Sequence, residues 1–290
     1  MSNYVSVYLM GGLGNQLFQI FASLAFCLEN DYELIMPYSE KLQTGHVRNT
    51  YWENFLQELK PFTNINEPIT NEKLFAFPVF REQDFRYNPF PRLEDANTHY
   101  MILFGYFQSY KYFLSKEKEI FDLIKLQEQQ EMIKNKYMKN TDNVISMHFR
   151  IGDYKKIQNC HPLMTIEYYE NALNEIVSNY KADTKVKILY FCEEQDKEEV
   201  NDMIEKLKVK KIGENIEYER ATNKASDWEQ MLLMSVCENN IIANSSFSWF
   251  GAYFNQNENK KVCYPSLWFG PDMKKDLRDL FPESWIKIDI

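Results

Sequence analysis

Apolar, β-branched runs alternate with helical patterns from residue 143 to residue 264, and this alternation limits the possible folds more than any other feature. The runs have the length of strands, and Thr165 and a Ser226–Glu229 capping box are placed to begin two of the helices. The predicted strands cover 143–149, 186–192, 215–219, 240–243 and 261–264, and the predicted helices cover 166–180, 196–208, 227–238 and 247–255. Strands joined by helices form right-handed crossovers and a parallel sheet. The second half of the chain is therefore predicted to be Rossmann-like.

The first half repeats this pattern less regularly. Strands are predicted at 4–10, 33–36 and 100–104, and helices at 17–28 and 115–138. Between these elements, residues 37–100 contain many prolines and aromatic residues, which indicate short helices and loops of the kind that vary specificity. The polar stretch Asn140–Asn143 is a natural boundary. We therefore expect an α/β protein of two Rossmann-like domains, 1–140 and 141–290, facing a central cleft that is the default ligand site.

Three side chains that handle charge follow the predicted strand 143–149. His148, Arg150 and Asp153 stand within six residues of one another. The carboxyl ends of the strands are where open α/β sheets bind ligands. Arg150 can donate two parallel hydrogen bonds to a phosphate or carboxylate, and Asp153 can orient Arg150 or His148. The alternative is a structural ion pair at the end of a strand.

A glycine-rich loop follows the first predicted strand. Gly12 and Gly14 precede Asn15 and Gln16, and the helical pattern begins at Leu17. A strand, a glycine-rich loop and a helix can together hold a phosphate. The dinucleotide fingerprint G-x-G-x-x-G is incomplete, because Leu17 stands at the third glycine position, and this weakens the hypothesis of an oxidoreductase. The alternative is a tight turn without a ligand, which leaves Asn15 and Gln16 unexplained.

A second polar cluster follows the predicted strand 240–243. Asn244, Ser245, Ser246 and Ser248 present an amide and three hydroxyls where a helix begins. Hydroxyls and backbone N–H groups at a helix N-terminus suit phosphate oxygens. The alternative is an ordinary serine N-cap. This cluster and the arginine cluster are predicted to end two strands of one sheet, where they could bind the two phosphates of a nucleotide sugar.

Charge and cysteine content exclude other classes of protein. The net charge of −9 argues against nonspecific binding of nucleic acid, which needs a basic surface. The five cysteines are widely spaced, and no C-x-x-C pair indicates a zinc or redox site. Neither a signal peptide nor an apolar stretch of about 20 residues is present. A cytoplasmic protein is expected, with peripheral membrane association left open.

Four segments together resemble glycosyltransferase family 11, the α-1,2-fucosyltransferases. Their order and spacing match the family over nearly the whole chain, and the last segment is long enough to be specific. They are GGLGNQLFQ at 11–19, GYFQSYKYF at 105–113, HFRIGDY at 148–154 and DWEQMLLMSVCENNIIANSSFSWFGAYF at 227–254. The resemblance implies a GT-B fold, GDP-fucose as donor, inversion at the anomeric carbon, and no required metal or other cofactor. It also implies a galactose-terminated glycan whose 2-hydroxyl accepts the fucose.

The resemblance also implies roles for individual residues. Arg150 would pair with the β-phosphate of the donor as negative charge builds on the leaving GDP, while His148 and Asp153 would shape the same pocket. Asn15 would reach the donor or the reacting centre. The remaining donor-binding residues would be Gly12, Gly14, Gln16, Asn244, Ser245, Ser246 and Ser248. Many relatives have a second arginine where this chain has Ile151, so a second guanidinium contact is not expected here.

The catalytic base and the acceptor glycan stay open at this stage. An inverting transfer needs a group that takes the proton of the acceptor hydroxyl. Glu82, Asp84, Asp153 and the donor phosphate are all candidates. His46 and Arg48 could also line a pocket. A GT-B transferase with another nucleotide sugar, or a noncatalytic protein that binds nucleotides or carbohydrates, is the alternative to a fucosyltransferase.

Overall fold

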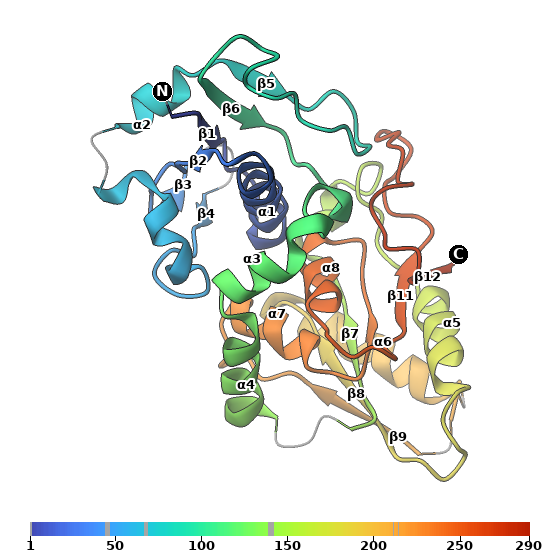
Figure 1. Ribbon diagram of the computed structural model, residues 1–290. Coiled ribbons are helices and arrows are strands. Elements are labelled where there is room, and N and C mark those ends of the chain that lie inside the picture. Colours follow the sequence, from blue (N-terminus) through green and yellow to red (C-terminus); the bar gives the residue numbers. More distant parts are fainter. Residues whose placement is uncertain (1, 44–46, 67–68, 139–141, 211, 214) are drawn as a thin grey trace. The chain divides into compact units, whose positions relative to one another are not determined.

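The computed structural model describes residues 2–43, 47–66, 69–138, 142–210, 212–213 and 215–290 (Figure 1). It divides into two compact units. Unit 1 comprises Met1–Glu128 and Lys275–Pro282, and unit 2 comprises Gln129–Lys274 and Glu283–Ile290. The boundary predicted at residue 140 is therefore misplaced, and the return of 275–282 to unit 1 was not expected. One cause is Gln130, whose buried amide donates hydrogen bonds to Ser235 Oγ at 2.8 Å and to the Phe254 carbonyl at 2.9 Å, both in unit 2.

Unit 1 is built on a four-stranded parallel sheet with the order β2-β1-β6-β5. The strands are β1 (Tyr4–Val7), β2 (Glu33–Leu34), β5 (Val79–Arg81) and β6 (Tyr100–Phe104). Three of them fall within the predicted strands, whereas β5 was not predicted. The sheet places the ends of β1 and β6 side by side at its centre.

Helix α1 (Leu13–Asn30) crosses from β1 to β2. It begins four residues before the predicted start, so that Gly14, Asn15 and Gln16 belong to its first turn rather than to a loop. Fourteen of its residues are buried, which makes it the central helix of unit 1. It ends at Asp31, whose φ of 56° is left-handed and whose N–H donates to the Cys27 carbonyl.

The rest of unit 1 consists of short elements, as the prolines predicted. Residues 37–100 contain the antiparallel pair β3 (Lys41–Leu42) and β4 (Arg48–Asn49), a 3-10 helix at Gln57–Phe62 and α2 (Asn71–Phe75). The single helix predicted for 115–138 is wrong. Lys125 has a φ of 51° and separates α3 (Glu117–Leu123) from α4 (Leu126–Tyr137), and α4 lies mostly in unit 2.

Unit 2 is built on a six-stranded parallel sheet with the order β12-β11-β10-β7-β8-β9. Numbered from β7, this is 6-5-4-1-2-3, the Rossmann order. The strands are β7 (Val144–His148), β8 (Val186–Phe191), β9 (Ile216–Arg220), β10 (Asn239–Ile241), β11 (Val262–Pro265) and β12 (Ile286–Ile288). The predicted α/β class with parallel sheets is confirmed, and only β12 was missed in this unit.

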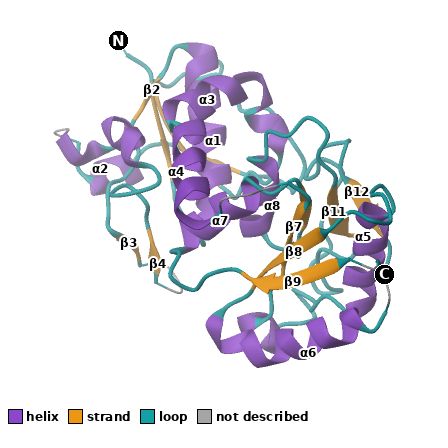
Figure 2. Ribbon diagram, turned by 90° about the horizontal axis from the view of Figure 1, so that it is seen from below, coloured by secondary structure: helices purple, strands orange, loops and turns teal. Residues whose placement is uncertain are grey.

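Two pairs of helices cover the two faces of this sheet. The pairs are α5 (Ile166–Val177) with α6 (Lys197–Lys208), and α7 (Asp227–Ser235) with α8 (Ser246–Tyr253). Ile145 and Met147 point into the core that α5 and α6 close. Ser146 bonds Asn240, which in turn bonds the α7 carbonyl of Met234, so alternate residues of β7 face the other pair. The strands, orange in Figure 2, lie between the two pairs.

Both predicted helix starts in unit 2 are confirmed. The Thr165 hydroxyl accepts a hydrogen bond from the Tyr168 N–H and begins α5. Ser226 and Glu229 form the reciprocal capping box that begins α7. Such caps satisfy N–H groups that the first turn of a helix leaves without partners. The sequence therefore sets where these helices start.

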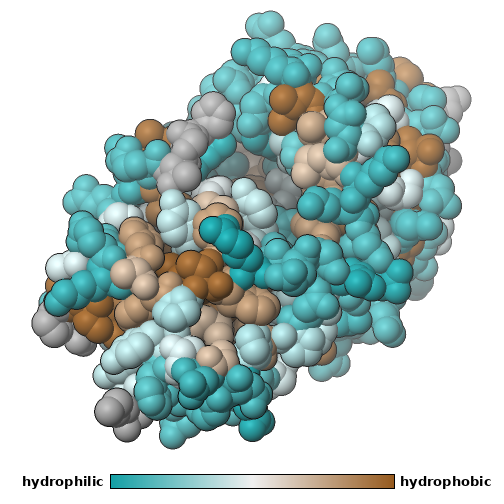
Figure 3. Space-filling model, turned by 90° about the horizontal axis from the view of Figure 1, so that it is seen from above, coloured by the Kyte–Doolittle hydropathy of each residue, from teal (hydrophilic) through white to brown (hydrophobic). Residues whose placement is uncertain are grey.

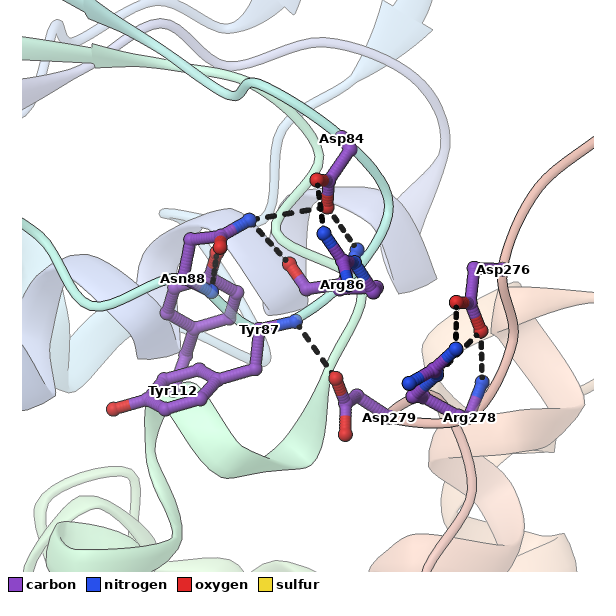
Figure 4. A network of polar contacts seen from close by, with 8 residues as sticks. All are labelled: Asp84, Arg86, Tyr87, Asn88, Tyr112, Asp276, Arg278 and Asp279. Carbon is purple, nitrogen blue, oxygen red and sulfur yellow. Dashed lines mark hydrogen bonds and ion pairs between the residues drawn. The ribbon is translucent and has the colours of Figure 1, made fainter.

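The segment 275–282 is fixed to unit 1 through Asp279 (Figure 4). Its carboxylate accepts from Lys111 Nζ at 2.5 Å and from the Tyr87 N–H at 3.1 Å, and its carbonyl accepts from Ser109 Oγ at 2.6 Å. Only 9% of Asp279 is exposed. A buried carboxylate needs partners of this kind, because an unpaired buried charge is costly. One side chain therefore holds three parts of unit 1 together.

The surface is mixed in polarity. Figure 3 shows one larger group of hydrophobic residues, at the lower left, and several smaller ones among hydrophilic residues on the face that it draws. Within the described part of the chain, no helix has both the length and the apolar character needed to cross a membrane.

Candidate active site

The arginine cluster and the serine cluster lie at the switch point of the unit-2 sheet. His148 is the last residue of β7, and Asn244 stands three residues after the end of β10. The two strands are neighbours in register, with Ile241 opposite Met147. The crossovers run in opposite directions from this pair of strands, which opens a crevice for ligands at their carboxyl ends. The expectation that both clusters end strands of one sheet is confirmed.

Arg150 is held between two carboxylates. It forms ion pairs with Asp153, as predicted, and with Glu193, which the sequence analysis missed. The guanidinium also lies 5.0 Å from the ring centroid of Tyr154. The side chain of Arg150 is 20% exposed, whereas those of Asp153 and Glu193 are 49% and 45% exposed. The structural ion pair and the binding role are thus compatible, because the carboxylates orient a cation that remains accessible.

The loop after Arg150 is fixed by its backbone. The Gly152 N–H donates to the buried carboxylate of Asp196 at 2.8 Å, and a Cβ at Gly152 would lie 3.1 Å from Glu193 Oε2. Gly152 also has a φ of +32°, which favours glycine. Ile151 is buried in the core of unit 2. Position 151 therefore supplies packing in this chain.

His148 is a buried, neutral imidazole. Only 7% of the residue is exposed, and burial lowers its pKa to about 3, with a further contribution from the charge of Arg150. Its ring centroid lies 5.6 Å from that of Phe247 in α8. A neutral imidazole can form hydrogen bonds but cannot act as a counter-charge. His148 is thus suited to shaping the site, and Arg150 supplies the positive charge beside it.

Two side chains of the serine cluster form hydrogen bonds with the backbone at the start of α8. Ser245 is the N-cap and accepts from the Phe247 N–H at 3.3 Å, as the alternative predicted. Ser248 is fully buried, and its hydroxyl donates to the backbone carbonyl of Ala243 or Ser245 at 3.4 Å. Ser246 is half-buried at the first position of the helix. The structure thus gives Ser245 and Ser248 functions in the helix itself.

Three buried polar atoms around this switch point lack a hydrogen-bond partner among the described residues. They are His148 Nδ1, His161 Nδ1 and Asn244 Oδ1. The amide of Asn244 is otherwise well held, since Nδ2 donates to the Pro162 and Trp268 carbonyls at 2.9 and 3.2 Å. Leaving a buried polar atom unpaired costs about 1–3 kcal/mol, so such atoms point to a ligand or a water molecule.

Tyr154 connects the two clusters. Its hydroxyl donates to the Asn244 carbonyl at 3.2 Å, and its ring stacks on His161 with centroids 4.8 Å apart. The guanidinium of Arg150 lies over the same ring of Tyr154. His161 was not among the site residues predicted from the sequence. Its only signal is its position in the connection between β7 and α5, close to the arginine cluster.

The glycine-rich segment of unit 1 forms a tight turn. Gly11 has a φ of +81°, and a Cβ there would lie 2.4 Å from Asn15 Nδ2. Gly12 is the N-cap of α1 and Gly14 is buried in the first turn. Gln16 is 1% exposed, and its Nε2 donates to the carbonyls of Gly11 and Asn49 at 3.0 and 2.9 Å. Gln16 therefore fixes the turn, and its expected contact with the donor stays a prediction.

Asn15 is paired with Gln108. The Nε2 of Gln108 donates to Asn15 Oδ1 at 2.7 Å. Asn15 follows β1 and Gln108 follows β6, the two central strands of the unit-1 sheet. These two neutral side chains are called the amide pair below; Asn15 is half-buried and Gln108 is buried. Gln108 lies in a family motif and in a polar group that follows the predicted strand 100–104, but it was not selected as a site residue.

The other candidates of unit 1 do not form one cluster. Asp84 is exposed and bonded to Arg86 and Asn88 (Figure 4), whereas Glu82 accepts hydrogen bonds from backbone N–H groups. Arg48 is exposed in β4, and His46 lies outside the described residues. Among the described residues, no group of three or more His, Cys, Asp or Glu side chains could hold a metal ion.

Comparison with protein families and curated proteins gives a consistent result. The family model described as glycosyl transferase family 11 matches residues 1–289. The O-antigen biosynthesis glycosyltransferase WbnK of Escherichia coli is 30% identical over 197 residues, which cover 64% of this chain and 60% of that protein. An alpha-1,2-colitosyltransferase of Escherichia coli is 25% identical over 303 residues, 97% of each chain.

Solved structures resemble the chain at low sequence identity. A variant of Arabidopsis thaliana FUT1 in complex with GDP is 12% identical, with a TM-score of 0.49, and the match covers 91% of this chain and 70% of that one. The fucosyltransferase NodZ from Bradyrhizobium is 11% identical, with a TM-score of 0.42, and the match covers 87% of this chain and 93% of that one.

Proposed function

Because the chain belongs to glycosyltransferase family 11, we propose that it is an α-1,2-fucosyltransferase of GT-B type. It would transfer L-fucose from GDP-fucose, with inversion, to the 2-hydroxyl of a terminal galactoside on a glycan. One observation carries the proposal. An accessible arginine stands at the switch point of a Rossmann sheet, beside buried polar atoms that have no partner.

Arg150 would stabilise the leaving group. In the transfer, the acceptor oxygen forms a bond to the anomeric carbon of fucose while the bond from that carbon to the β-phosphate oxygen breaks. Negative charge then builds on the GDP, and a guanidinium that is already oriented by Asp153 and Glu193 can meet it without rearrangement. The acceptor proton passes to a base or to the donor phosphate.

Neutral groups would position the nucleotide around this charge. His148 and Asn244 each offer a buried atom without a partner, and Ser246 stands at the N-terminus of α8. Ser245 and Ser248 would act through the helix start that they stabilise, while Asp153 would act through Arg150. Unit 2 would thus bind GDP-fucose. Unit 1 would serve the acceptor, and Gly12, Gly14 and Gln16 would shape the turn that presents Asn15.

The transfer is proposed to need no metal. Stabilisation of the leaving GDP by Arg150 would replace a divalent cation. Activity in excess EDTA equal to that in added magnesium or manganese would support this point. Activity that EDTA abolishes and a cation restores would overturn it.

A different donor is the second candidate. The relative that matches 97% of the chain is called an alpha-1,2-colitosyltransferase, so a colitosyl donor is a specific alternative to GDP-fucose. The noncatalytic alternative predicts GDP binding without turnover of any donor. For the acceptor, the relation to a protein named for O-antigen biosynthesis favours an O-antigen glycan.

GDP release from GDP-fucose, measured in EDTA with and without lactose, tests the function. Acceptor-dependent release is expected, with a fucosyl-α-1,2-galactose linkage in the product by NMR. Release only from a colitosyl donor would replace the proposed donor. GDP binding without release from any donor and acceptor would favour the noncatalytic alternative.

A further inference from the structure

A half-buried glutamate in unit 1, Glu82, holds the loop that carries Gln108 of the amide pair. Glu82 follows β5, and its backbone N–H donates to the Phe104 carbonyl at 2.9 Å, which extends the pairing of β5 with β6. Its carboxylate then accepts from the Tyr106 N–H at 2.8 Å and from the Phe107 N–H at 2.9 Å, one bond at each oxygen. The carboxylate thus binds the two residues that directly precede Gln108.

We propose that Glu82 is a positioning residue for sugar transfer, which sets the amide pair Asn15–Gln108 where a hydroxyl of the acceptor sugar is bound. This inference rests on the proposed function, because it assigns the amide pair to the acceptor side of that reaction. Amides suit sugar hydroxyls, since each amide offers both a hydrogen-bond donor and an acceptor and carries no charge.

Gly105 allows the close approach on which this arrangement depends. A Cβ at residue 105 would lie 2.4 Å from the Cβ of Glu82 and 2.9 Å from its Oε2. Any larger residue would push the carboxylate away from the two N–H groups. The end of β6, Gly105 and the Glu82 carboxylate therefore depend on one another for their positions. The sequence Gly105-Tyr106-Phe107-Gln108 must directly follow β6.

Phe107 shows that the loop is forced into its shape. Its φ is 51°, which is uncommon for a residue other than glycine, and it is fully buried. Its ring packs edge-on against Phe90 and Tyr112, with centroids 5.1 and 5.6 Å apart. Such a conformation persists only where the surroundings determine it. The bond from the Phe107 N–H to Glu82 is one of the contacts that do so.

Because Gln108 is fixed by the loop, it fixes Asn15 in turn. Its Nε2 donates to Asn15 Oδ1 at 2.7 Å, and Nδ2 of Asn15 packs against Gly11. The next residue, Ser109, is fixed through its bond to the Asp279 carbonyl. The loop is thus fixed on both sides of Gln108, and the orientation of the Asn15 amide follows from it.

The same contacts argue against Glu82 as the catalytic base. Both carboxylate oxygens of Glu82 accept hydrogen bonds from backbone N–H groups, and these bonds favour its ionised form. Burial has the larger effect on the pKa of Glu82, which it raises. Lys275 and Asp84 are the charged groups that contribute to its electrostatic environment. A carboxylate bound in this way acts on the backbone that it holds.

Glu82→Gln tests the proposal, with Glu58→Gln as the matched control. Glutamine has the same size but presents an N–H donor to one of the two N–H groups, so it breaks half of the contact. Glu58 is a unit-1 carboxylate in a surface ion pair with Lys125.

The kcat of Glu82→Gln should fall roughly 10- to 100-fold, the size of effect that a 1 Å misplacement produces. The Kd for GDP should stay within about twofold, since only acceptor positioning changes. A kcat equal to that of Glu58→Gln would overturn the proposal.

A double-mutant cycle separates positioning from general damage. Gln108→Ala should lower kcat on its own, and adding Glu82→Gln to it should cause little further loss, because both changes act through one path. Fully multiplied losses would overturn the proposal. If Glu82→Gln does not fold, Glu82→Asp takes its place in the cycle, because it keeps the charge but shortens the reach.

Hydrogen exchange provides a readout that does not depend on turnover. The N–H groups of Tyr106 and Phe107 should exchange slowly in the wild type and faster in Glu82→Gln, with no change in Glu58→Gln. Equal exchange in all three proteins would overturn the inference whether or not fucose is transferred. Absence of fucosyl transfer by the wild type would instead refute the proposed function. Slow exchange of the Tyr106 and Phe107 N–H groups would in that case still support the contact between Glu82 and the loop.

Discussion

At the carboxyl edge of the unit-1 sheet the central side chains are two neutral amides, whereas at that of the unit-2 sheet they are a guanidinium and two carboxylates. Both sets follow two neighbouring central strands, β1 and β6 in unit 1 and β7 and β10 with β8 beside β7 in unit 2. The amide pair is placed by backbone hydrogen bonds and close-packed glycines, and the guanidinium is placed by charge. Under the proposed function, one sheet geometry would support two kinds of recognition, of hydroxyl groups at the amide pair and of phosphates at Arg150.

The largest effect is expected at the charged edge. Arg150→Ala should lower kcat by about 10²- to 10³-fold, or about 2.7–4 kcal/mol, the cost of losing a donor that meets developing charge. The measurement is GDP release at saturating GDP-fucose and lactose. Arg278→Ala is the matched control, because Arg278 is an exposed arginine paired with Asp276. Unchanged activity of Arg150→Ala would refute the role assigned to Arg150.

A smaller effect is expected at the neutral edge. Asn15→Ala should lower kcat roughly 10- to 100-fold, about 1.4–2.7 kcal/mol, by removing one member of the amide pair. GDP binding, measured by calorimetry, should change little. An equal loss of GDP binding would erase the contrast between the two edges, and unfolding of the variant would indicate a purely structural role.

The pH dependence of stability tests whether His148 is neutral. Burial places its folded pKa at about 3, below that of an unfolded histidine. The unfolded chain therefore binds a proton that the folded chain rejects, so stability falls as the pH drops below about 6.5, by about 1.4 kcal/mol per pH unit from this group. Urea unfolding at pH 6.5, 5.5 and 4.5 measures this slope.

Matched variants isolate that contribution. His148→Gln should show a shallower loss of stability on acidification than the wild type, whereas His99→Gln, which changes an exposed histidine, should not. Identical slopes for the wild type and His148→Gln would mean that His148 is accessible to protons and charged in the folded protein.

The smallest effect is expected away from both edges. Asp279→Asn removes the ion pair with Lys111 but can keep a hydrogen bond to the Tyr87 N–H. A cost of about 1 kcal/mol in the free energy of urea unfolding is expected. GDP binding should not change. Loss of GDP binding in this variant would show that the segment 275–282 influences nucleotide affinity.

The periodic elements were predictable because their signals are local. The strands of unit 2 from β7 to β11 and the caps at Thr165 and Ser226 follow from apolar runs and side chains a few residues apart. The strands β5 and β12 were not predicted, and β5 lies in the stretch 37–100, whose prolines and aromatic residues indicated short helices and loops. The break at Lys125 was missed because neither glycine nor proline marks it.

The partners of the site residues depend on contacts that are distant in the sequence. Glu193 pairs with Arg150 because β8 lies beside β7, and the two residues are 43 positions apart. Glu82 could not be recognised as a loop-holding residue while β5 was unassigned, since its position at a strand end was not visible. The family resemblance located the motifs, and the sheet order was needed to show what holds them.

The return of residues 275–282 to unit 1 has a consequence for how the protein is made. A ribosome releases residues 1–128 long before Asp279, so Lys111 and the Tyr87 N–H must wait for their partner while all but the end of unit 2 is synthesised. Unit 1 is completed almost last, although it comes first in the gene. A nascent chain halted before residue 275 should therefore contain an unfinished first unit, exposed to chaperones and proteases.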